Sequence, residues 1–309
     1  MTNEQLLKAL TPPSGVVDAV IDTDTYNEID DQFALSYMIR SDDKINLKAI
    51  YAAPFFNQHS TSPKDGMEKS YNEIFNILTL MKEEELKKVV YRGSEQYLPS
   101  ETEPVISPAA EHLCKLASGY TTENPLYVVA IGAITNVASA LLIDPTIASK
   151  IVLVWLGGHS YEWPNTKEFN MYQDVAAARV IFNSGAPVVL LPCNGVVSAF
   201  RVSGDDMRAR FYGKNDLCTY LTVHSEDEVK SYVAEGKAWT RVIWDVTAVA
   251  WLTGANGTSN KFMSYKLTPA PICEYDFTYS FDNTRHNIVY VYYINRDALF
   301  NDMIDKLTK

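Results

Sequence analysis

The sequence predicts an α/β protein with a mostly parallel central sheet flanked by helices. Short apolar runs of strand length alternate with helix-like segments through most of the chain, which is typical of right-handed βαβ units. No low-complexity linker or internal repeat divides the sequence, and 309 residues are enough to bury a large core. The length allows either one large α/β domain or two smaller ones.

The strands of this sheet are predicted from apolar runs that end at Gly, Pro or polar residues. The first run leads into a helix whose expected buried stripe is Ile29, Phe33, Leu35, Met38 and Ile39. The predicted strands are residues 16–21, 46–53, 89–91, 126–131, 151–156 and 187–191. The helices expected between the later strands are residues 66–81, 109–117, 136–142 and 175–183.

The C-terminal third gives weaker strand signals. Residues 204–236 are predicted to be helical and polar, and a further helix is predicted over residues 240–252, with Asp245 among apolar neighbours. Strands near 262–267 and 287–293 and a helix at 296–307 complete the expected elements.

The charge and the cysteine pattern exclude several classes of protein. A formal net charge of -11 and a pI near 5.0 argue against nucleic acid or an anionic membrane as the main partner. The four cysteines have no CxxC spacing, which argues against a thiolate metal site or a disulfide framework. We see neither a signal peptide nor an apolar run long enough to span a membrane, and together these features favour a cytoplasmic location.

An acidic loop follows the first predicted strand. Its carboxylates would repel one another without a counter-charge, and an all-oxygen set favours Ca²⁺ or Mg²⁺ over zinc. The alternative is a solvated loop that caps the next helix. Because the loop lies where open α/β sheets bind ligands, we favour the cation site. Its five carboxylates are Asp22, Asp24, Glu28, Asp30 and Asp31.

Polar clusters also follow other predicted strands, at residues 57–59, 131–136 and 159–170. The carboxyl ends of neighbouring parallel strands face one crevice, so we expect these clusters to meet. Asp245 is expected to be buried, where it needs either a hydrogen-bond partner or a metal ion. The sequence leaves both roles open.

Several motifs, in order along the chain, resemble those of the nucleoside hydrolases, the inosine-uridine-preferring N-ribohydrolase family. The resemblance implies that residues 1–309 form a single catalytic domain with a Rossmann-like nucleoside hydrolase fold. This chain would be a divergent member, because five residues separate Asp24 from the paired acids where the family usually has three. The motifs are Asp22-Thr-Asp24 with Asp30-Asp31, Gly132-Ala-Ile-Thr-Asn136, Gly157-Gly158 with Glu168-Phe-Asn170 and Asp174, and Trp244-Asp245.

The resemblance also implies a tightly bound Ca²⁺ ion and a role for each motif. The ion would be held by the side chains of Asp24, Asp31 and Asp245 and by the backbone carbonyl of Ile131, together with a water and two ribose hydroxyls. Asp30 would be the general base that takes a proton from this water. Glu168 and Asn170 would bind the ribose, and Asp22 would support the loop or a metal ligand through a hydrogen bond.

The departures from the family pattern fall where substrate choice could change. The longer loop adds Asn27 and Glu28; either could touch substrate or metal, and Glu28 could equally be an acid in the first turn of a helix. Trp244 stands where purine-active members often have a histidine that protonates the leaving base. Trp cannot act as an acid, and it could either stack on substrate or pack in the core.

Three further residues are weaker candidates. Asn57 is a candidate sugar contact, although the second strand lacks the Gly-Asn ending of the family. Glu162 lies near the position of the family's substrate-loop Asn. His159 is the only imidazole nearby, so it could be a replacement general acid or a structural donor.

The sequence therefore predicts a Ca²⁺-dependent hydrolase that cleaves the N-glycosidic bond of a ribonucleoside or related riboside. One alternative is an enzyme of the same fold that acts on another carbohydrate linkage, suggested by the longer loop and by Trp163 and Trp244. The other is a metal-dependent binder of sugars or nucleosides without activity. Homo-oligomers are common in the resembled family, but the sequence has no interface signature and does not identify the aglycone.

Overall fold

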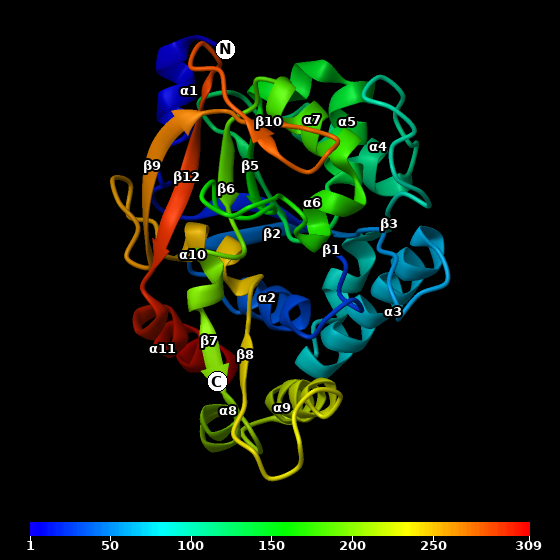
Figure 1. Ribbon diagram of the computed structural model, residues 1–309, viewed down its shortest axis with the longest axis vertical. Coiled ribbons are helices and arrows are strands. Elements are labelled where there is room, and N and C mark those ends of the chain that lie inside the picture. Colours follow the sequence, from blue (N-terminus) through cyan, green and yellow to red (C-terminus); the bar gives the residue numbers. More distant parts are fainter.

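A central sheet of eight strands runs through the protein (Figure 1). The computed structural model describes all residues from 1 to 309. The strands are β1 (Val17–Thr23), β2 (Ile45–Ala52), β3 (Val90–Arg92), β4 (Leu126–Ala130), β5 (Ile151–Leu156), β6 (Val188–Leu191), β9 (Met263–Pro269) and β12 (Asn287–Ile294). Their order is β3-β2-β1-β4-β5-β6-β12-β9, and only β9 pairs antiparallel. The prediction of a mostly parallel sheet flanked by helices is confirmed.

Helices cover both faces of the sheet, so each central strand is apolar on both sides. In β1, Ala19 and Ile21 pack into one core, whereas Val20 packs into the other. The first core lies under α2 (Asp30–Ile39), α3 (Pro63–Met81), α10 (Val246–Thr253) and α11 (Arg296–Leu307). The second lies under α4 (Pro108–Ala117), α5 (Thr135–Ile143) and α7 (Val175–Asn183).

The largest error in the predicted elements concerns residues 240–252, which are not one helix. Thr240–Val242 form the short strand β8, which pairs antiparallel with β7 (Arg201–Ser203). Asp245 then lies at the N-terminus of α10 and not inside the helix. The partner of β8 is distant in the sequence, so local hydrophobic periodicity could not reveal the pairing.

Other differences are smaller. The predicted helical region 204–236 is two helices, α8 (Gly204–Arg210) and α9 (Asp216–Val229). Residues Asp30 to Met38 of α2 are all buried, so this helix has no exposed face opposite the predicted stripe. An unpredicted N-terminal helix, α1 (Asn3–Ala9), begins with a capping box between Thr2 and Gln5. The remaining elements are 3₁₀ helices at Glu84–Val89, Pro145–Ser149 and Val197–Ala199, α6 (Phe169–Gln173), β10 (Ile272–Cys273) and β11 (Tyr279–Ser280).

The strand order places a crevice between β1 and β4. From β1 the chain first builds outward through β2 and β3, then returns to the other side of β1 with β4. Loops that leave the carboxyl ends of β1 and β4 therefore diverge, which is where ligands bind in open α/β sheets. None of the helices is both long and apolar enough to cross a lipid bilayer.

Candidate active site

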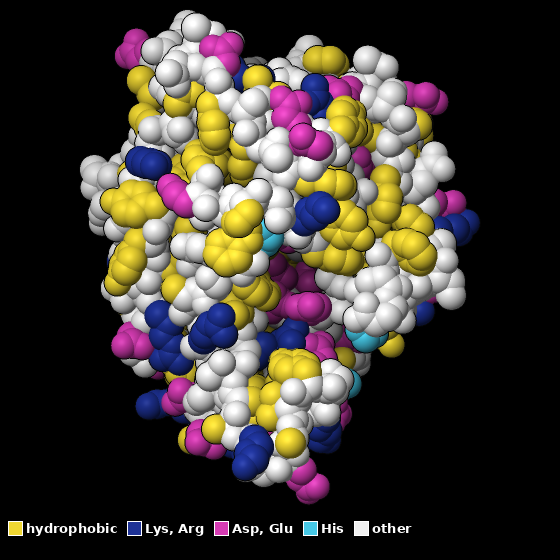
Figure 2. Space-filling model, in the orientation of Figure 1, with side chains coloured by type: hydrophobic (Ala, Val, Ile, Leu, Met, Phe, Trp, Pro, Cys, Tyr) yellow, Lys and Arg dark blue, Asp and Glu magenta, His cyan; other side chains and the backbone are white.

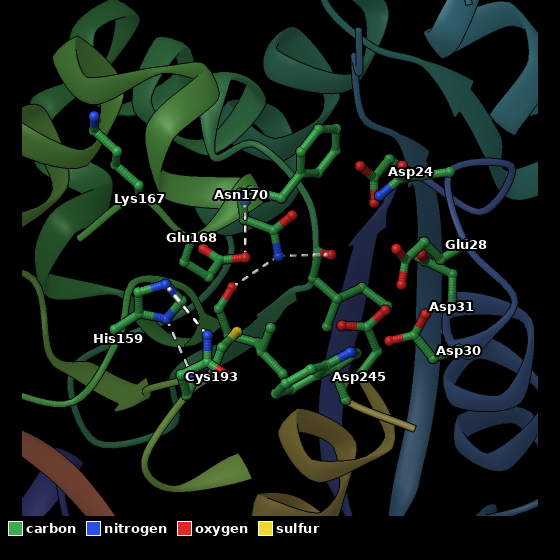
Figure 3. A pocket seen from close by; sticks show the side chains of 16 residues that line it. Asp24, Glu28, Asp30, Asp31, His159, Lys167, Glu168, Asn170, Cys193 and Asp245 are labelled. Atoms are coloured by element: carbon green, nitrogen blue, oxygen red, sulfur yellow. Dashed lines mark hydrogen bonds between the residues drawn. The ribbon is translucent and has the colours of Figure 1, made fainter. Parts of the chain in front are cut away.

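A cavity of about 250 Å³ lies at this edge of the sheet. Figure 2 shows it as a hollow in the middle of one face, with acidic side chains at its bottom. Two groups of side chains face each other across it in Figure 3: the acidic wall, which is Asp24, Glu28, Asp30, Asp31 and Asp245, and the opposite wall, which is His159, Glu168, Asn170 and Cys193. The other lining residues are Asn27, Ile131, Leu156, Lys167, Phe169, Asn194 and Trp244.

Asp24 follows β1 and has no protein partner for its charge. Both carboxylate oxygens are buried and accept no hydrogen bond. Burial and the nearby Asp31 and Asp30 raise its pKa well above the usual range. Gly132 leaves room for this carboxylate, because a Cβ at Gly132 would lie 3.1 Å from Cγ of Asp24. A fully buried, unpartnered carboxylate is costly unless a cation binds to it.

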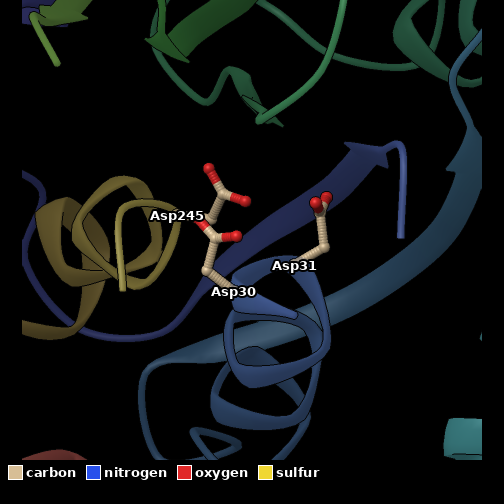
Figure 4. A group of neighbouring side chains, drawn as sticks. All are labelled: Asp30, Asp31 and Asp245. Atoms are coloured by element: carbon tan, nitrogen blue, oxygen red, sulfur yellow. The ribbon is translucent and has the colours of Figure 1, made fainter. Parts of the chain in front are cut away.

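Asp30, Asp31 and Asp245 form the densest acidic cluster of the site (Figure 4). Asp30 and Asp31 lie in the first turn of α2, and oxygen atoms of all three residues lie within 4.8 Å of one another. Burial, and then repulsion from neighbouring carboxylates, raises the pKa of Asp31 and Asp245 well above the usual range. The hydroxyl of Thr23 donates to Asp31. Carboxylate oxygens from three residues on two chain segments fit a hard divalent cation.

The backbone carbonyl of Ile131 also lines the cavity, at the residue after β4. It accepts a hydrogen bond from Nδ2 of Asn170 over 3.1 Å, and the same amide donates to the carbonyl of Leu156 over 3.0 Å. Asn170 thus connects the loops after β4 and β5. Since a carbonyl oxygen has two lone pairs, that of Ile131 can accept this bond and still face a cation.

Glu168 on the opposite wall is partnered, in contrast to Asp24. It caps α6: its oxygens accept from the backbone N–H groups of Asn170 over 2.9 Å and Met171 over 3.0 Å. A third bond, of 2.8 Å, comes from the N–H of Gly158, whose φ of +68° places it in the left-handed region. Burial raises the pKa of Glu168 to about 7, although these hydrogen bonds oppose the shift.

Asp22 lies behind the cavity and does not line it. Its Oδ1 accepts a 2.7 Å bond from Nδ2 of Asn136, whose Oδ1 in turn accepts from the N–H of Ser94. Burial raises the pKa of Asp22 to about 7. These hydrogen bonds join β1 to the first turn of α5, and the supporting role of Asp22 in the site stays a prediction.

His159 reaches the cavity on the opposite wall, away from Asp30 (Figure 3). Its Nδ1 accepts a 3.3 Å hydrogen bond from the backbone N–H of Asn194, and burial lowers the pKa of the imidazole. Its ring centroid lies 5.7 Å from that of Trp163, which does not line the cavity. These contacts hold the ring against the loop after β6.

Two further predicted residues lie outside the cavity. Asn57 donates through Nδ2 to Oδ1 of Asn27 over 2.5 Å, and only Asn27 of this pair lines the cavity. Glu162 is exposed and is not part of the lining. Trp244 lines the cavity and also packs partly against the core, so its core packing is observed and its stacking on a substrate stays a prediction.

Arg241 is a residue of this region that sequence reasoning missed. Its side chain is 9% exposed and forms ion pairs of 2.6 Å with Glu228 and 3.1 Å with Glu28, and its Nη2 lies 3.9 Å from Oδ1 of Asp30. Burial and the charge of Glu28 raise the pKa of Asp30 to about 7, while Arg241 opposes the shift. Since 213 residues separate Arg241 from Glu28, no local motif signals the contact.

The sequence model of the inosine-uridine preferring nucleoside hydrolases matches residues 19–279, a range that contains both walls. This protein belongs to that nucleoside hydrolase family. It is a hydrolase that acts on an N-glycosidic bond. The family is metal-dependent, in agreement with the acidic cluster in the cavity.

Comparisons with individual proteins agree with this assignment. The pyrimidine-specific ribonucleoside hydrolase RihA of Salmonella paratyphi A is 25% identical over 241 residues, which cover 68% of this chain and 76% of RihA. The plant nucleoside hydrolase PpNRh1 superposes with a TM-score of 0.74 at 16% identity, over 94% of this chain and 99% of that one. The purine-preferring ribonucleoside hydrolase from Gardnerella vaginalis superposes with a TM-score of 0.71 at 18% sequence identity, over 94% of this chain and 98% of that one. At these identities the two structures show a shared fold.

Proposed function

We propose that this nucleoside hydrolase is a Ca²⁺-dependent enzyme that releases the base or another aglycone from a riboside, with residues 1–309 as one catalytic domain. The observation that carries the proposal is the carboxylate of Asp24. Its two buried oxygens lack any protein donor, and it lies beside the cluster of Asp30, Asp31 and Asp245. A cation is the group that would satisfy this arrangement.

Asp24, Asp31 and Asp245 would hold the ion with the carbonyl of Ile131. Ca²⁺ fits this set better than Mg²⁺, because it accepts six to eight oxygen ligands in flexible geometry, whereas Mg²⁺ usually keeps several waters. When bound, the ion supplies positive charge to the acidic wall, lowers the pKa of a coordinated water and orients the ribose hydroxyls.

Asp30 is the proposed general base. The attacking water gives a proton to Asp30 as it adds to the anomeric carbon, and the sugar becomes oxocarbenium-like. A pKa of about 7 suits a base that works near neutral pH. Arg241, 3.9 Å away, favours the ionised form that this step requires.

Asn170 and Glu168 are the proposed ribose contacts. Nδ2 of Asn170 is already bonded to two carbonyls, which fixes the side chain and leaves its Oδ1 as the acceptor available to a sugar hydroxyl. Glu168 is fixed in the same way by three backbone donors. The two side chains are thus held in place before substrate arrives, which reduces the entropy cost of binding.

The test is a ribose-release assay on a panel of ribonucleosides and other ribosides. Activity should be present with Ca²⁺, fall after chelation and return when Ca²⁺ is added back, with Mg²⁺ restoring less. Activity that survives thorough chelation would contradict the metal dependence. Failure to cleave any ribosyl compound, in protein whose folding is verified by circular dichroism, would contradict the proposed function as a whole.

A further inference from the structure

The cavity has a strong excess of negative charge. Six carboxylates line it: those of the acidic wall and Glu168. Lys167 is the only lining residue with a permanent positive charge, and its Nζ lies 5.0 Å from the ring centroid of Phe277. A bound divalent cation and Lys167 together would offset three of the six charges. The positive charge of Arg241, which lies behind the lining, is balanced by the carboxylate of Glu228 at 2.6 Å. The remaining negative field favours a cationic ligand over a neutral one.

None of the lining side chains is positioned to protonate a leaving group beside Asp30. Glu28 is paired with Arg241 as a carboxylate, and Glu168 uses its oxygens as acceptors of backbone N–H groups. His159 and Lys167, which also carry protons, lie on the side of the cavity away from Asp30 (Figure 3). Trp244 adjoins Asp245 and has no acidic proton of useful strength.

From this charge and this lack of an acid we infer that the site prefers ribosides whose aglycone is a cationic aromatic ring, attached through the positively charged ring nitrogen. The inference rests on the proposed ribosidase function. Water adds to the anomeric carbon while the bond from this carbon to nitrogen breaks. The bonding electron pair passes to the ring nitrogen and neutralises its charge, and the proton of the water goes to Asp30. Ribose, a neutral heteroaromatic base and a proton are the products, so the leaving group needs no acid.

Two lining residues suit such a ring. Trp244 offers an aromatic side chain held partly in the core, and a cation over an indole face is favoured by the ring quadrupole. Glu28 contributes a carboxylate from the lengthened loop, fixed by the 3.1 Å contact with Arg241. Because both residues lie near the general base, they belong to the part of the cavity next to the anomeric carbon and its leaving group.

The test compares kcat/KM for N-ribosylnicotinamide, which is cationic, with kcat/KM for uridine and inosine, which are neutral. The wild-type ratio should favour the cation by at least tenfold, and Glu28→Gln should lower this ratio about tenfold. Spontaneous lability of the cationic substrate is the same for every variant, so the change in ratio reports the protein's contribution. Glu226→Gln is the matched control, because it removes the same kind of charge from an ion pair with Arg208 outside the cavity.

The outcomes separate the two proposals. A ratio at or below one in the wild type, or an unchanged ratio in Glu28→Gln, overturns the preference for a cationic aglycone while ribose release from neutral substrates still supports the hydrolase. If neither class of substrate releases ribose in the presence of Ca²⁺, the proposed function fails together with the inference.

Discussion

The two walls of the cavity contain similar residues that are stabilised in different ways. On the acidic wall, Asp24 is buried without any hydrogen-bond donor. On the opposite wall, Glu168 is buried to a similar degree but receives three backbone N–H groups. Folding therefore accounts for the position of Glu168, whereas the position of Asp24 makes physical sense only with a bound ligand. Hydrogen bonding, more than burial or residue type, separates the carboxylate that we propose binds the cation from the carboxylate that folding alone holds in place.

Among changes to the two walls, the largest effect on catalysis is expected on the acidic wall, at the proposed general base. Asp30→Asn removes the proposed base but keeps the shape of the side chain, so kcat should fall by about 10²–10⁴-fold while Ca²⁺ still binds. Steady-state kinetics with the best substrate, combined with calorimetric Ca²⁺ titration, checks both parts. Full activity in Asp30→Asn would remove the base assignment.

A second effect concerns the pH dependence of stability. The pKa of Glu168 is about 7 in the folded state and near its ordinary value of 4.5 in the unfolded chain. The folded protein therefore holds this proton more tightly, and the resulting stability is fully present below pH 4.5 and is lost as pH rises to about 7. Between pH 5.5 and pH 8 the free energy of unfolding should fall by about 2 kcal/mol from this group alone.

Urea denaturation of the wild type and of Glu168→Gln over this pH range measures the effect. The variant has no carboxyl proton at this position, so its stability should fall less steeply. Parallel curves for the two proteins would show that burial does not hold the Glu168 proton.

Arg241 lies behind the acidic wall. It forms an ion pair with Glu228, which holds the guanidinium in place, and it lies close to Asp30. Arg241→Met removes a positive charge that lowers the pKa of Asp30, so the acidic limb of the pH profile of kcat/KM should move up by about one pH unit. Arg208→Met, which breaks an ion pair outside the cavity, is the control and should leave the profile unchanged. An unshifted limb in Arg241→Met would mean that the arginine is structural only.

The smallest effect is expected at Asn57, which reaches the cavity only through Asn27. Loss of this neutral hydrogen bond in Asn57→Ala should raise KM about threefold with little change in kcat. Because the two side chains share one hydrogen bond, the rise in KM in the double variant with Asn27→Ala should be smaller than the product of the rises in the two single variants. A large fall in kcat for Asn57→Ala alone would instead support the direct sugar contact predicted from the sequence.

The parts of the site that could be predicted from sequence are those built by one strand and the turn that follows it. Asp24, Asp30 and Asp31 lie within one βα connection, so their spacing and the adjacent apolar run already place them at the edge of the sheet. Ile131 directly follows β4 in the same way, whereas Asn170 lies in α6 after the long loop that leaves β5, and the structure brings the two residues together.

The rest depends on contacts between distant segments. The β7–β8 pair, which moves Asp245 from the interior of a predicted helix to the start of one, has no local signature. The same is true of Arg241, which approaches Glu28 and Asp30 only because β8 returns toward α2. Hydrogen bonding to backbone, which distinguishes Glu168 from Asp24, likewise follows from three-dimensional geometry and cannot be read from residue type.

The central claim is that the acidic wall binds a cation, and that the carboxylate of Asp24, which folding leaves without a hydrogen-bond donor, is one of its ligands. Calorimetric titration of the chelator-treated protein with Ca²⁺ tests it most directly, with Asp24→Asn compared with Glu168→Gln. The account predicts one tight site in the wild type, nearly unchanged affinity in Glu168→Gln, and at least a 100-fold loss in Asp24→Asn, because breaking a buried charge pair costs about 3–5 kcal/mol. Wild-type affinity in Asp24→Asn, or no binding to the wild type, would contradict the account.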